Sequence, residues 1–449
     1  MTDILETITE WAAKLTWNDL PPEVRERASY ALSDTVSTMV GGAPTAAGVI
    51  ALDFAAAGSG GSPLVGRGMT TTPDHAAFGN GVAASALDFD DGHYLAGAIH
   101  PGSVIVPAVL AAASPSTTVA EALLAQVVGY EIGLRAAARL WPKHDGDHYH
   151  ATGCAGAIGA AAAAAKVLGL DADGLARAIK ISWVHAPMST FGTPMVKESI
   201  GWGAMTGVAA AQLAAAGFMK APEGYAIATN DVLPPTPFHE PGSAEDPFVT
   251  SIGSRYEVMH TYFKSFAACR YTHAAGAGFQ GLLAEHGIGP ADIASIRIGT
   301  HRSATFLDEV APKTIDTAQY SFPLVIASLA LWGAAGAAEM DAARLDEPER
   351  LAFAEKVRLE YDADLDQHYP ARYPSRVEVT TVDGRTVSGI YLDAPGDPGT
   401  SFGIEEMRAK WLLLLGPALG DDRAAAVLAA LADGEAVLQD VLAPVWEAR

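Results

Sequence analysis

Long runs of alanine constrain this chain more than any other feature, because they favour helices that carry almost no side-chain bulk. Residues 160–165 are six consecutive alanines, and residues 209–216 are alanine except for Gln212 and Leu213. Alanine has the highest intrinsic helix propensity of any residue. Side chains this small let neighbouring helices pack close together, so we expect a helical core rather than a flexible low-complexity tract.

Helical periodicity occupies the first half of the chain and returns near its C-terminal end. Apolar residues recur at helical spacing, and proline or glycine separates one segment from the next. The predicted helices are residues 4–15, 22–42, 104–113, 119–140, 156–168, 175–185, 202–217, 404–414 and 423–441.

The pattern changes after about residue 265. Residues 294–300 alternate like a strand, and two further predicted strands, residues 375–381 and 386–392, flank a VDGR turn as a hairpin. Between these strands the sequence predicts helices at residues 274–286, 322–331 and 347–357. The predicted fold is mainly α: a large all-helical domain built from both chain ends (residues 1–265 and 400–449) and a smaller α+β domain inserted at residues 266–399.

The charge balance restricts the partners of this chain. Its 449 residues include 29 Lys and Arg against 52 Asp and Glu, a formal net charge of −23. Such a surface repels nucleic-acid phosphates and anionic lipid, so we expect no nucleic acid and no membrane as a partner. Charged residues make up only 18% of the chain, below the roughly 25% of an average globular protein, which indicates surface buried in an oligomer.

Cysteine content and the N-terminal residues indicate a reducing compartment. Only Cys154 and Cys269 are present, so we expect no disulfide framework, and their alanine and glycine neighbours indicate small packed thiols. Residues 1–17 are acidic and amphipathic and lack the basic start and apolar core of a signal peptide. We therefore expect a cytoplasmic protein.

The densest polar cluster in an otherwise apolar setting is residues 87–93 (LDFDDGH), followed by His100 before a Pro-Gly pair. Three carboxylates within four positions cannot all be buried and ionised cheaply. In one interpretation, Asp90 and Asp91 cap or solvate the end of a helix. In the other, Asp88 is held beside a histidine or lysine and tunes it, and His100 lies on a turning backbone where site residues are common.

A second cluster, residues 144–150 (HDGDHYH), has the composition of a metal site, but its spacing matches no hydrolase motif such as HExxH. A metal-dependent hydrolase therefore stays an alternative. Residues 152–156 (TGCAG) open a predicted helix and offer backbone N–H groups to a substrate carboxylate. His150, just before that helix, is then placed to act as an acid or a base over the bound anion.

A third group is cationic. Lys197 lies in the segment MVKESIGW, and Lys264, Arg270 and His273 lie within ten positions of one another at the predicted domain junction. Arginine can bind a carboxylate through two hydrogen bonds, whereas lysine acts more as a point charge. The alternative interpretation of these residues is that they are ordinary surface cations.

Taken together, these segments resemble the MmgE/PrpD family, which includes 2-methylcitrate dehydratase, cis-aconitate decarboxylase and iminodisuccinate epimerase. The resemblance covers nearly the whole chain, and its most specific motif is GNGVAASALDFDD at residues 79–91. The other matching segments, in order, are residues 20–24, 31–36, 41–42, 100–101, 129–133, 150–159, 197–201, 264–273, 320–323 and 396–398.

The resemblance implies a helical domain made from both chain ends with a smaller α/β domain, a homodimer, and no metal or organic cofactor. It also implies a site in a cleft between the domains. By motif, the implied catalytic residues are Asp88, His100, His150, Lys197, Lys264 and His273, and the implied substrate-binding residues are Arg270, Thr152 and Asp91.

The family's chemistry is proton abstraction or delivery beside a carboxylate, so the expected substrate is a small di- or tricarboxylic acid. The expected activity is that of a 2-methylcitrate dehydratase-like hydro-lyase. The alternatives are an epimerase of an iminodisuccinate-like acid, a cis-aconitate-type decarboxylase, or a non-catalytic carboxylate-binding homologue. Leu324 stands where decarboxylase-like members carry a tyrosine, and Gly276 falls where many members have an aspartate. The spacing from Asp88 to His100 is longer than in the decarboxylase branch of the family. These departures argue against decarboxylation.

Overall fold

The computed structural model describes residues 4–94, 99–146, 151–187, 196–218, 250–400 and 402–448. The chain forms two compact units. Unit 1 comprises Met1–Ala86, Asp90–Thr261 and Met407–Arg449, and unit 2 comprises Leu87–Phe89 and Tyr262–Glu406. The predicted inserted domain, residues 266–399, is therefore somewhat shorter than unit 2, which also takes in three residues of the acidic motif.

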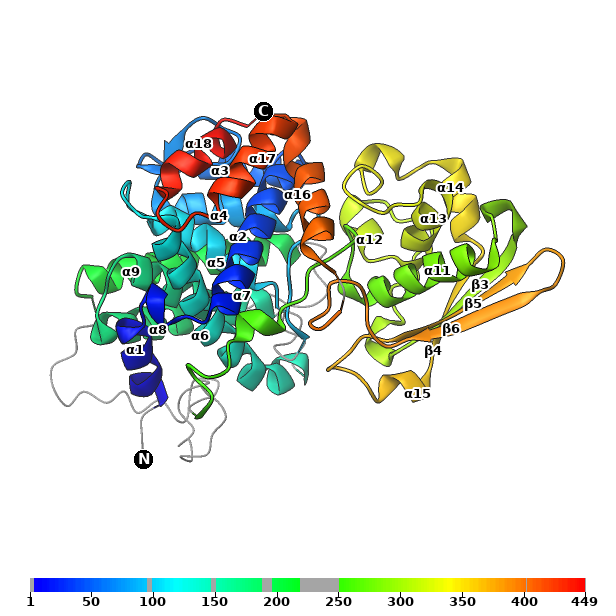
Figure 1. Cartoon of the computed structure of the whole chain (residues 1–449), viewed down its shortest axis with the longest axis horizontal. Coiled ribbons are helices and arrows are strands. Elements are labelled where there is room, and N and C mark those ends of the chain that lie inside the picture. The colour runs from blue at the N-terminus through cyan, green and yellow to red at the C-terminus, as the bar shows by residue number, and fades with distance from the viewer. Residues whose placement is uncertain are drawn as a thin grey trace. The chain divides into compact units, whose positions relative to one another are not determined.

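Unit 1 is built almost entirely of helices (Figure 1). Proline in the first turn begins α2, α4 and α5, where its fixed φ suits the helix and its missing N–H leaves no bond unmade. The helices are α1 (Ile4–Lys14), α2 (Pro22–Gly42), α3 (Ala46–Ala55), α4 (Pro73–Ser85), α5 (Pro101–Ala112), α6 (Val119–Gly146), α7 (Ala151–Val167), α8 (Ala172–Val184), α9 (Val196–Ala215), α16 (Ile404–Leu419), α17 (Asp421–Ala430) and α18 (Leu438–Trp446). A short pair of antiparallel strands, β1 (Ser62–Pro63) and β2 (Thr70–Thr71), completes the unit.

The alanine-rich helices pack as closely as the sequence predicts. The run at residues 160–165 is buried within α7, and α7 packs against both α6 and α9. A Cβ atom added at Gly207 of α9 would lie 2.4 Å from Cβ of Ala160, which is too close for two carbon atoms. The small residues on the facing sides of these helices are therefore required by the distance between the backbones.

Both ends of the chain contribute to unit 1. Asp34 of α2 is fully buried, and its Oδ1 lies 2.7 Å from Nζ of Lys410 and accepts a 3.0 Å hydrogen bond from Nε1 of Trp411, both on α16.

Among the described residues, no single helix is long and apolar enough to cross a membrane, although the bent pair α2 and α3 passes on length and composition alone.

Unit 2 contains a four-stranded mixed sheet in the order β4-β3-β5-β6 (Figure 1). Its strands are β3 (Ile293–Thr300), β4 (Val357–Tyr361), β5 (Ser375–Thr381) and β6 (Thr386–Tyr391), and β3 pairs parallel to β4 and antiparallel to β5. Alternate residues of β5 are buried, and helices pack against the sheet. The helices of this unit are α11 (His273–His286), α12 (Ile315–Gln319), α13 (Phe322–Trp332), α14 (Pro348–Ala354) and α15 (Ala363–Asp366).

The structure differs from the sequence prediction in several places, and three of them change the order of the elements. The helix predicted over residues 347–357 ends at Ala354, because Val357 already pairs with Ile296 of β3. The helix predicted over residues 423–441 is two helices, since Asp433 and Gly434 form a turn between α17 and α18. Helices α3 and α4 were not predicted, because glycine and alanine mask the helical periodicity of their segments.

Candidate active site

Lys264 and Asp88, both in unit 2, form a buried ion pair. The Nζ atom of Lys264 lies 2.6 Å from Oδ1 of Asp88 and donates a second hydrogen bond, 2.9 Å long, to the backbone oxygen of Asp88. Lys264 is fully buried and Asp88 is 6% exposed. Each charge replaces part of the hydration that the other has lost, so removing either one leaves an uncompensated buried charge.

The backbone of Asp88 is strained. In the described part of the chain, Asp88 is the one non-glycine residue with a positive φ, at 49°. A left-handed conformation costs of order 1–3 kcal/mol for a residue with a side chain, and such strain persists only where the surroundings impose it. Lys264 imposes it here by binding both the carbonyl and the carboxylate of Asp88.

His100 lies in unit 1, immediately before α5, and is 8% exposed. Its Nδ1 lies 2.8 Å from the backbone oxygen of Asp91 and 3.6 Å from Oδ1 of Asp90. Its backbone N–H donates to Oγ1 of Thr152 at 3.2 Å. Because a carbonyl oxygen can only accept, Nδ1 carries the proton and the neutral ring has its lone pair on Nε2. The contact thus sets His100 up to exchange a proton through Nε2.

Asp91 is 1% exposed and holds the start of α5. Its Oδ1 accepts from the backbone N–H of Gly102 at 2.8 Å, and its Oδ2 accepts from the hydroxyl of Tyr130 at 2.7 Å. Burial raises the pKa of Asp91 to about 7, although the hydrogen bonds from Tyr130 and Gly102 act in the opposite direction. A carboxyl group with this pKa exchanges protons near neutral pH.

Lys197 lies in the first turn of α9 and is 5% exposed. Its Nζ donates a 2.6 Å hydrogen bond to the backbone oxygen of Ala86. Lys197 and Lys264 therefore each bind a backbone oxygen within residues 86–88. In a chain with a net charge of −23, each of these lysines is a buried cation held on a backbone oxygen of its own unit.

Arg270 and His273 lie together in unit 2, around the start of α11. The Arg270 guanidinium forms an ion pair with Asp397, donates to the backbone oxygen of Pro395 at 3.2 Å, and lies 4.6 Å from the centre of the Tyr262 ring. His273 Nδ1 lies 3.2 Å from NH1 of Arg270, and its Nε2 lies 3.1 Å from the backbone oxygen of Ala268. Both side chains thus brace the surrounding backbone.

Apart from Lys197, the predicted site residues that the structure describes fall into two clusters, one in each unit. We call these the His100 cluster, which is Asp90, Asp91, His100, Tyr130 and Thr152, and the Lys264 cluster, which is Asp88, Lys264, Arg270, His273 and Asp397. The hydroxyl of Thr152, which is predicted to bind substrate, accepts a hydrogen bond from the backbone N–H of His100. The helix cap predicted for Asp90 and Asp91 is present at Asp91, which is buried rather than solvated. His150 lies outside the described residues.

Sequence reasoning did not select Tyr130 or Asp397. Each belongs to a segment that carries the family resemblance, GYEIG and GDP, but a tyrosine or aspartate in such a segment has no spacing that ties it to a distant partner. Tyr130 reaches Asp91 across 39 positions and Arg270 reaches Asp397 across 127. Only the folded chain identifies these pairs.

The structure bears on the metal site and on the two cysteines of the sequence. Within the described ranges, no three His, Cys, Asp or Glu side chains lie close enough to hold a metal ion, and the side chains of residues 144–150 lie outside what the structure describes. Burial raises the pKa of Cys154 and of Cys269 to about 12. Neither thiol forms the nucleophilic thiolate at neutral pH, in agreement with the prediction of packed thiols.

Family models match both parts of the chain. The MmgE/PrpD N-terminal domain matches residues 6–226, and the MmgE/PrpD C-terminal domain matches residues 266–433.

Curated relatives share the same name. A human protein named cis-aconitate decarboxylase is 29% identical over 340 residues, which is 70% of this chain and 66% of the human protein. The mouse protein of that name is 28% identical over 332 residues, with the same two shares. One from Aspergillus terreus (strain NIH 2624 / FGSC A1156) is 24% identical over 409 residues, 85% of this chain and 83% of that protein. The match thus spans just under two thirds of the human and mouse proteins.

Proposed function

This chain belongs to the MmgE/PrpD family, and from that membership we propose that it is a lyase acting on a small carboxylic acid, specifically a decarboxylase of cis-aconitate. The observation that carries the proposal is that the three relatives described above, which match 70–85% of this chain, are named cis-aconitate decarboxylases. The buried acid–base and ammonium groups of the two clusters support it.

The reaction requires one proton and a place for negative charge. The bond to one carboxylate breaks, and its electron pair forms a new double bond. The former double bond shifts its electrons to the carbon at its far end, and that carbon takes a proton. Carbon dioxide leaves, and a five-carbon unsaturated dicarboxylate remains. Fixed donors and cations stabilise the charge that develops during this shift.

The two clusters and Lys197 offer groups for both needs. We assign proton transfer to His100, whose protonated Nδ1 is held by the carbonyl of Asp91. We assign the substrate carboxylates to Lys197 and Lys264, with Asp88 orienting Lys264. Asp91 is a second proton-transfer group in this proposal, because burial raises its pKa to about 7. His150 stays a proposed acid or base.

Three predicted residues take supporting roles in this proposal. Thr152 positions the backbone of His100, and Arg270 and His273 hold the segment that carries Lys264. A substrate carboxylate would have to compete with Asp397 for the Arg270 guanidinium. Asp88 competes in the same way for the Lys264 ammonium, so Arg270 stays a proposed substrate-binding residue beside the two lysines.

The proposal replaces the dehydratase that the sequence favoured, because the named relatives support the decarboxylase alternative. Two of the three departures that argued against decarboxylation, Leu324 and Gly276, are packing positions. Leu324 is fully buried in the first turn of α13. A Cβ atom at Gly276 would lie 2.8 Å from the Phe266 ring and 2.9 Å from Leu329, so this position has no space for an aspartate. Neither position needs to supply the proton if His100 does.

The test is to incubate the purified protein with cis-aconitate in deuterated water and follow the products by NMR. We expect one molecule of carbon dioxide and one carbon-bound deuterium per molecule of dicarboxylate. Replacing His100 with asparagine should lower turnover by about 10²–10⁴-fold, the usual contribution of general acid–base catalysis. His185→Asn is the matched control, because His185 is exposed at the end of α8.

Other outcomes would overturn the proposal in recognisable ways. Loss of water from citrate or 2-methylcitrate would identify a dehydratase, and proton exchange in iminodisuccinate without loss of carbon dioxide would identify an epimerase. Binding without turnover would identify a carboxylate-binding homologue, and activity abolished by a chelator would identify a metal-dependent enzyme. We also propose a cytoplasmic homodimer, which sedimentation velocity and cell fractionation would test.

A further inference from the structure

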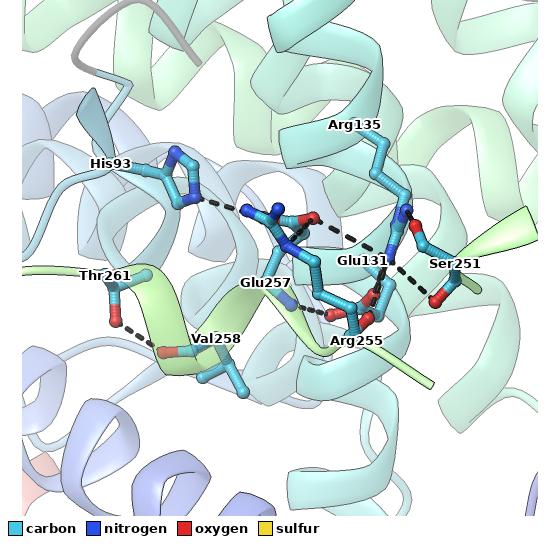
Figure 2. Close-up of polar contacts among 8 residues, drawn as sticks. All are labelled: His93, Glu131, Arg135, Ser251, Arg255, Glu257, Val258 and Thr261. Atoms are coloured by element: carbon cyan, nitrogen blue, oxygen red, sulfur yellow. Dashed lines mark hydrogen bonds and ion pairs between the residues drawn. The ribbon is translucent and has the colours of Figure 1, made fainter. Parts of the chain in front are cut away.

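Unit 1 contains a second group of charged side chains that the assignments above do not use. It consists of His93, Glu131, Arg135, Arg255 and Glu257, and we call it the Glu257 network (Figure 2). Glu131 is fully buried, His93 is 3% exposed, Arg135 is 6% exposed and Glu257 is 8% exposed. Burying this much charge is costly, so a network of this kind needs a reason beyond stability.

Glu257 is the centre of the network, and Figure 2 shows its side chain between His93 and Arg135. Its Oε2 lies 3.2 Å from Nε2 of His93, and its Oε1 lies 3.3 Å from Nε of Arg255 and 3.6 Å from NH2 of Arg135. The hydrogen bond from His93 and the two guanidinium groups lower the pKa of Glu257 to about 2, although burial acts in the opposite direction. Glu257 therefore accepts the hydrogen bond from His93 as a carboxylate at neutral pH.

The rest of the network fixes Glu257 to helix α6. Glu131 accepts a short hydrogen bond from the backbone N–H of Glu257 and bonds of 3.2 and 3.1 Å from Nε and NH2 of Arg135. Arg135 also donates to Oγ of Ser251 at 2.6 Å and to the backbone oxygen of Arg255 at 2.7 Å. The Glu257 carboxylate, which accepts the hydrogen bond from His93, is thus held in place by several hydrogen bonds and ion pairs.

His93 connects the Glu257 network to His100 through backbone contacts. The backbone N–H of His93 donates to the oxygen of Ile99 at 3.0 Å, and the two residues form an isolated antiparallel bridge. Ile99 directly precedes His100, and His100 Nδ1 is bonded to the oxygen of Asp91, two residues before His93. Ile99 and His100 are therefore both hydrogen-bonded to the stretch that contains His93, Ile99 to His93 itself and His100 to Asp91.

The side chain of His93 is oriented by its hydrogen bond to Glu257. Among the described residues its Nδ1 has no hydrogen-bond partner, so the bond from Nε2 to Glu257 determines the orientation of the ring. With this bond lost, a buried polar ring would remain without a partner and the segment would shift.

We propose that Glu257 and His93 form a positioning pair, which holds His100 at the distance from the substrate that its proton transfer requires. This inference rests on the proposed role of His100. A displacement of about 1 Å at a catalytic group can lower a rate about 10²-fold, so the pair acts on turnover without contacting the substrate.

The test compares His93→Leu, which removes the donor, with His93→Gln, whose amide can still donate to Glu257. We expect His93→Leu to lower kcat by about 10–100-fold with a smaller change in KM, and His93→Gln to recover most of the loss. In a His100→Asn background, His93→Leu should have no further effect on kcat, because a positioning residue acts only through the group it positions. His185→Leu is the exposed control.

A second measurement keeps this inference separate from the proposed function. NMR titration of the imidazole groups, with the His100 signal assigned by its loss in His100→Asn, should show a changed His100 titration in His93→Leu and an unchanged one in His93→Gln. This result would support the pair even if the wild-type protein does not decarboxylate cis-aconitate. An unchanged His100 titration in His93→Leu, or losses of kcat that multiply in the double variant, would overturn it. If His93→Leu does not fold, Glu257→Gln is judged by the same two criteria.

Discussion

Lys264 Nζ lies 2.6 Å from the carboxylate and 2.9 Å from the carbonyl oxygen of Asp88, although the two residues are 176 positions apart in the chain. One ammonium group thus neutralises the aspartate and holds its backbone at a φ of 49°. Removing the lysine would leave the aspartate charge buried without a partner and would remove the contact that holds the strained backbone.

We therefore expect Lys264→Met to destabilise the protein by about 3–5 kcal/mol, because the Asp88 carboxylate stays buried without its partner. Turnover should fall with it. Urea unfolding followed by circular dichroism measures the first effect, and the exposed Lys180→Met is the control. Equal stabilities of the two variants would contradict this account. Asp88→Asn should cost less than Asp88→Ala, since asparagine tolerates a positive φ.

Tyr130→Phe tests the hydrogen bond that acts on Asp91. Without the hydroxyl, the pKa of Asp91 should rise further above about 7. A carboxyl whose pKa is raised in the folded state stabilises at low pH and loses that contribution as the pH rises through the folded value. The variant should therefore lose about 1–3 kcal/mol at pH 8 and less at pH 5. Tyr361→Phe, which removes an exposed bond to Asp366, is the control and should show no such pH dependence.

His301→Phe tests a buried neutral histidine in unit 2. His301 is fully buried against Tyr271, Tyr369 and Tyr373, and neither ring nitrogen has a hydrogen-bond partner among the described residues. Burial lowers the pKa of His301 to about 4. Between pH 6.5 and 4 the unfolded chain binds a proton that the folded chain does not, so stability falls with falling pH by up to about 1.4 kcal/mol per unit.

Phenylalanine keeps the ring and cannot take up a proton. We expect His301→Phe to flatten the loss of stability between pH 6.5 and 4, measured as unfolding free energy across that range. The exposed His286→Phe provides the comparison. An unaltered slope in His301→Phe would mean that another group dominates the acid sensitivity.

Arg270 and Asp397 are coupled through their ion pair. Arg270→Met and Asp397→Ala should each destabilise by about 3–5 kcal/mol, because each leaves the other charge buried and alone. The double variant should lose much less than the sum of the two, and thermal unfolding of all four proteins gives the coupling energy. Strictly additive losses would show that the two residues do not act as a pair.

Features that depend on neighbouring residues could be predicted from the sequence, whereas contacts between residues far apart in the chain could not. The alanine runs predicted close helix packing correctly, and the alternation of residues 375–381 and 386–392 predicted β5 and β6, because both signals are local. Strand β4 was missed, since Val357 becomes a strand residue only through its pairing with Ile296. The polar motif at residues 87–93 was found from composition, but its partners were not.

The sequence by itself determined the family, the mainly helical fold and the short list of acids, histidines and lysines proposed to carry the chemistry, because these are properties of segments. Only the tertiary structure decided that Lys264 holds Asp88, that the carbonyl of Asp91 fixes the tautomer of His100, and that Asp397 occupies Arg270. The reason is physical: hydrogen bonds and ion pairs act over about 3 Å between atoms, and only folding brings residues this distant in the chain within that range.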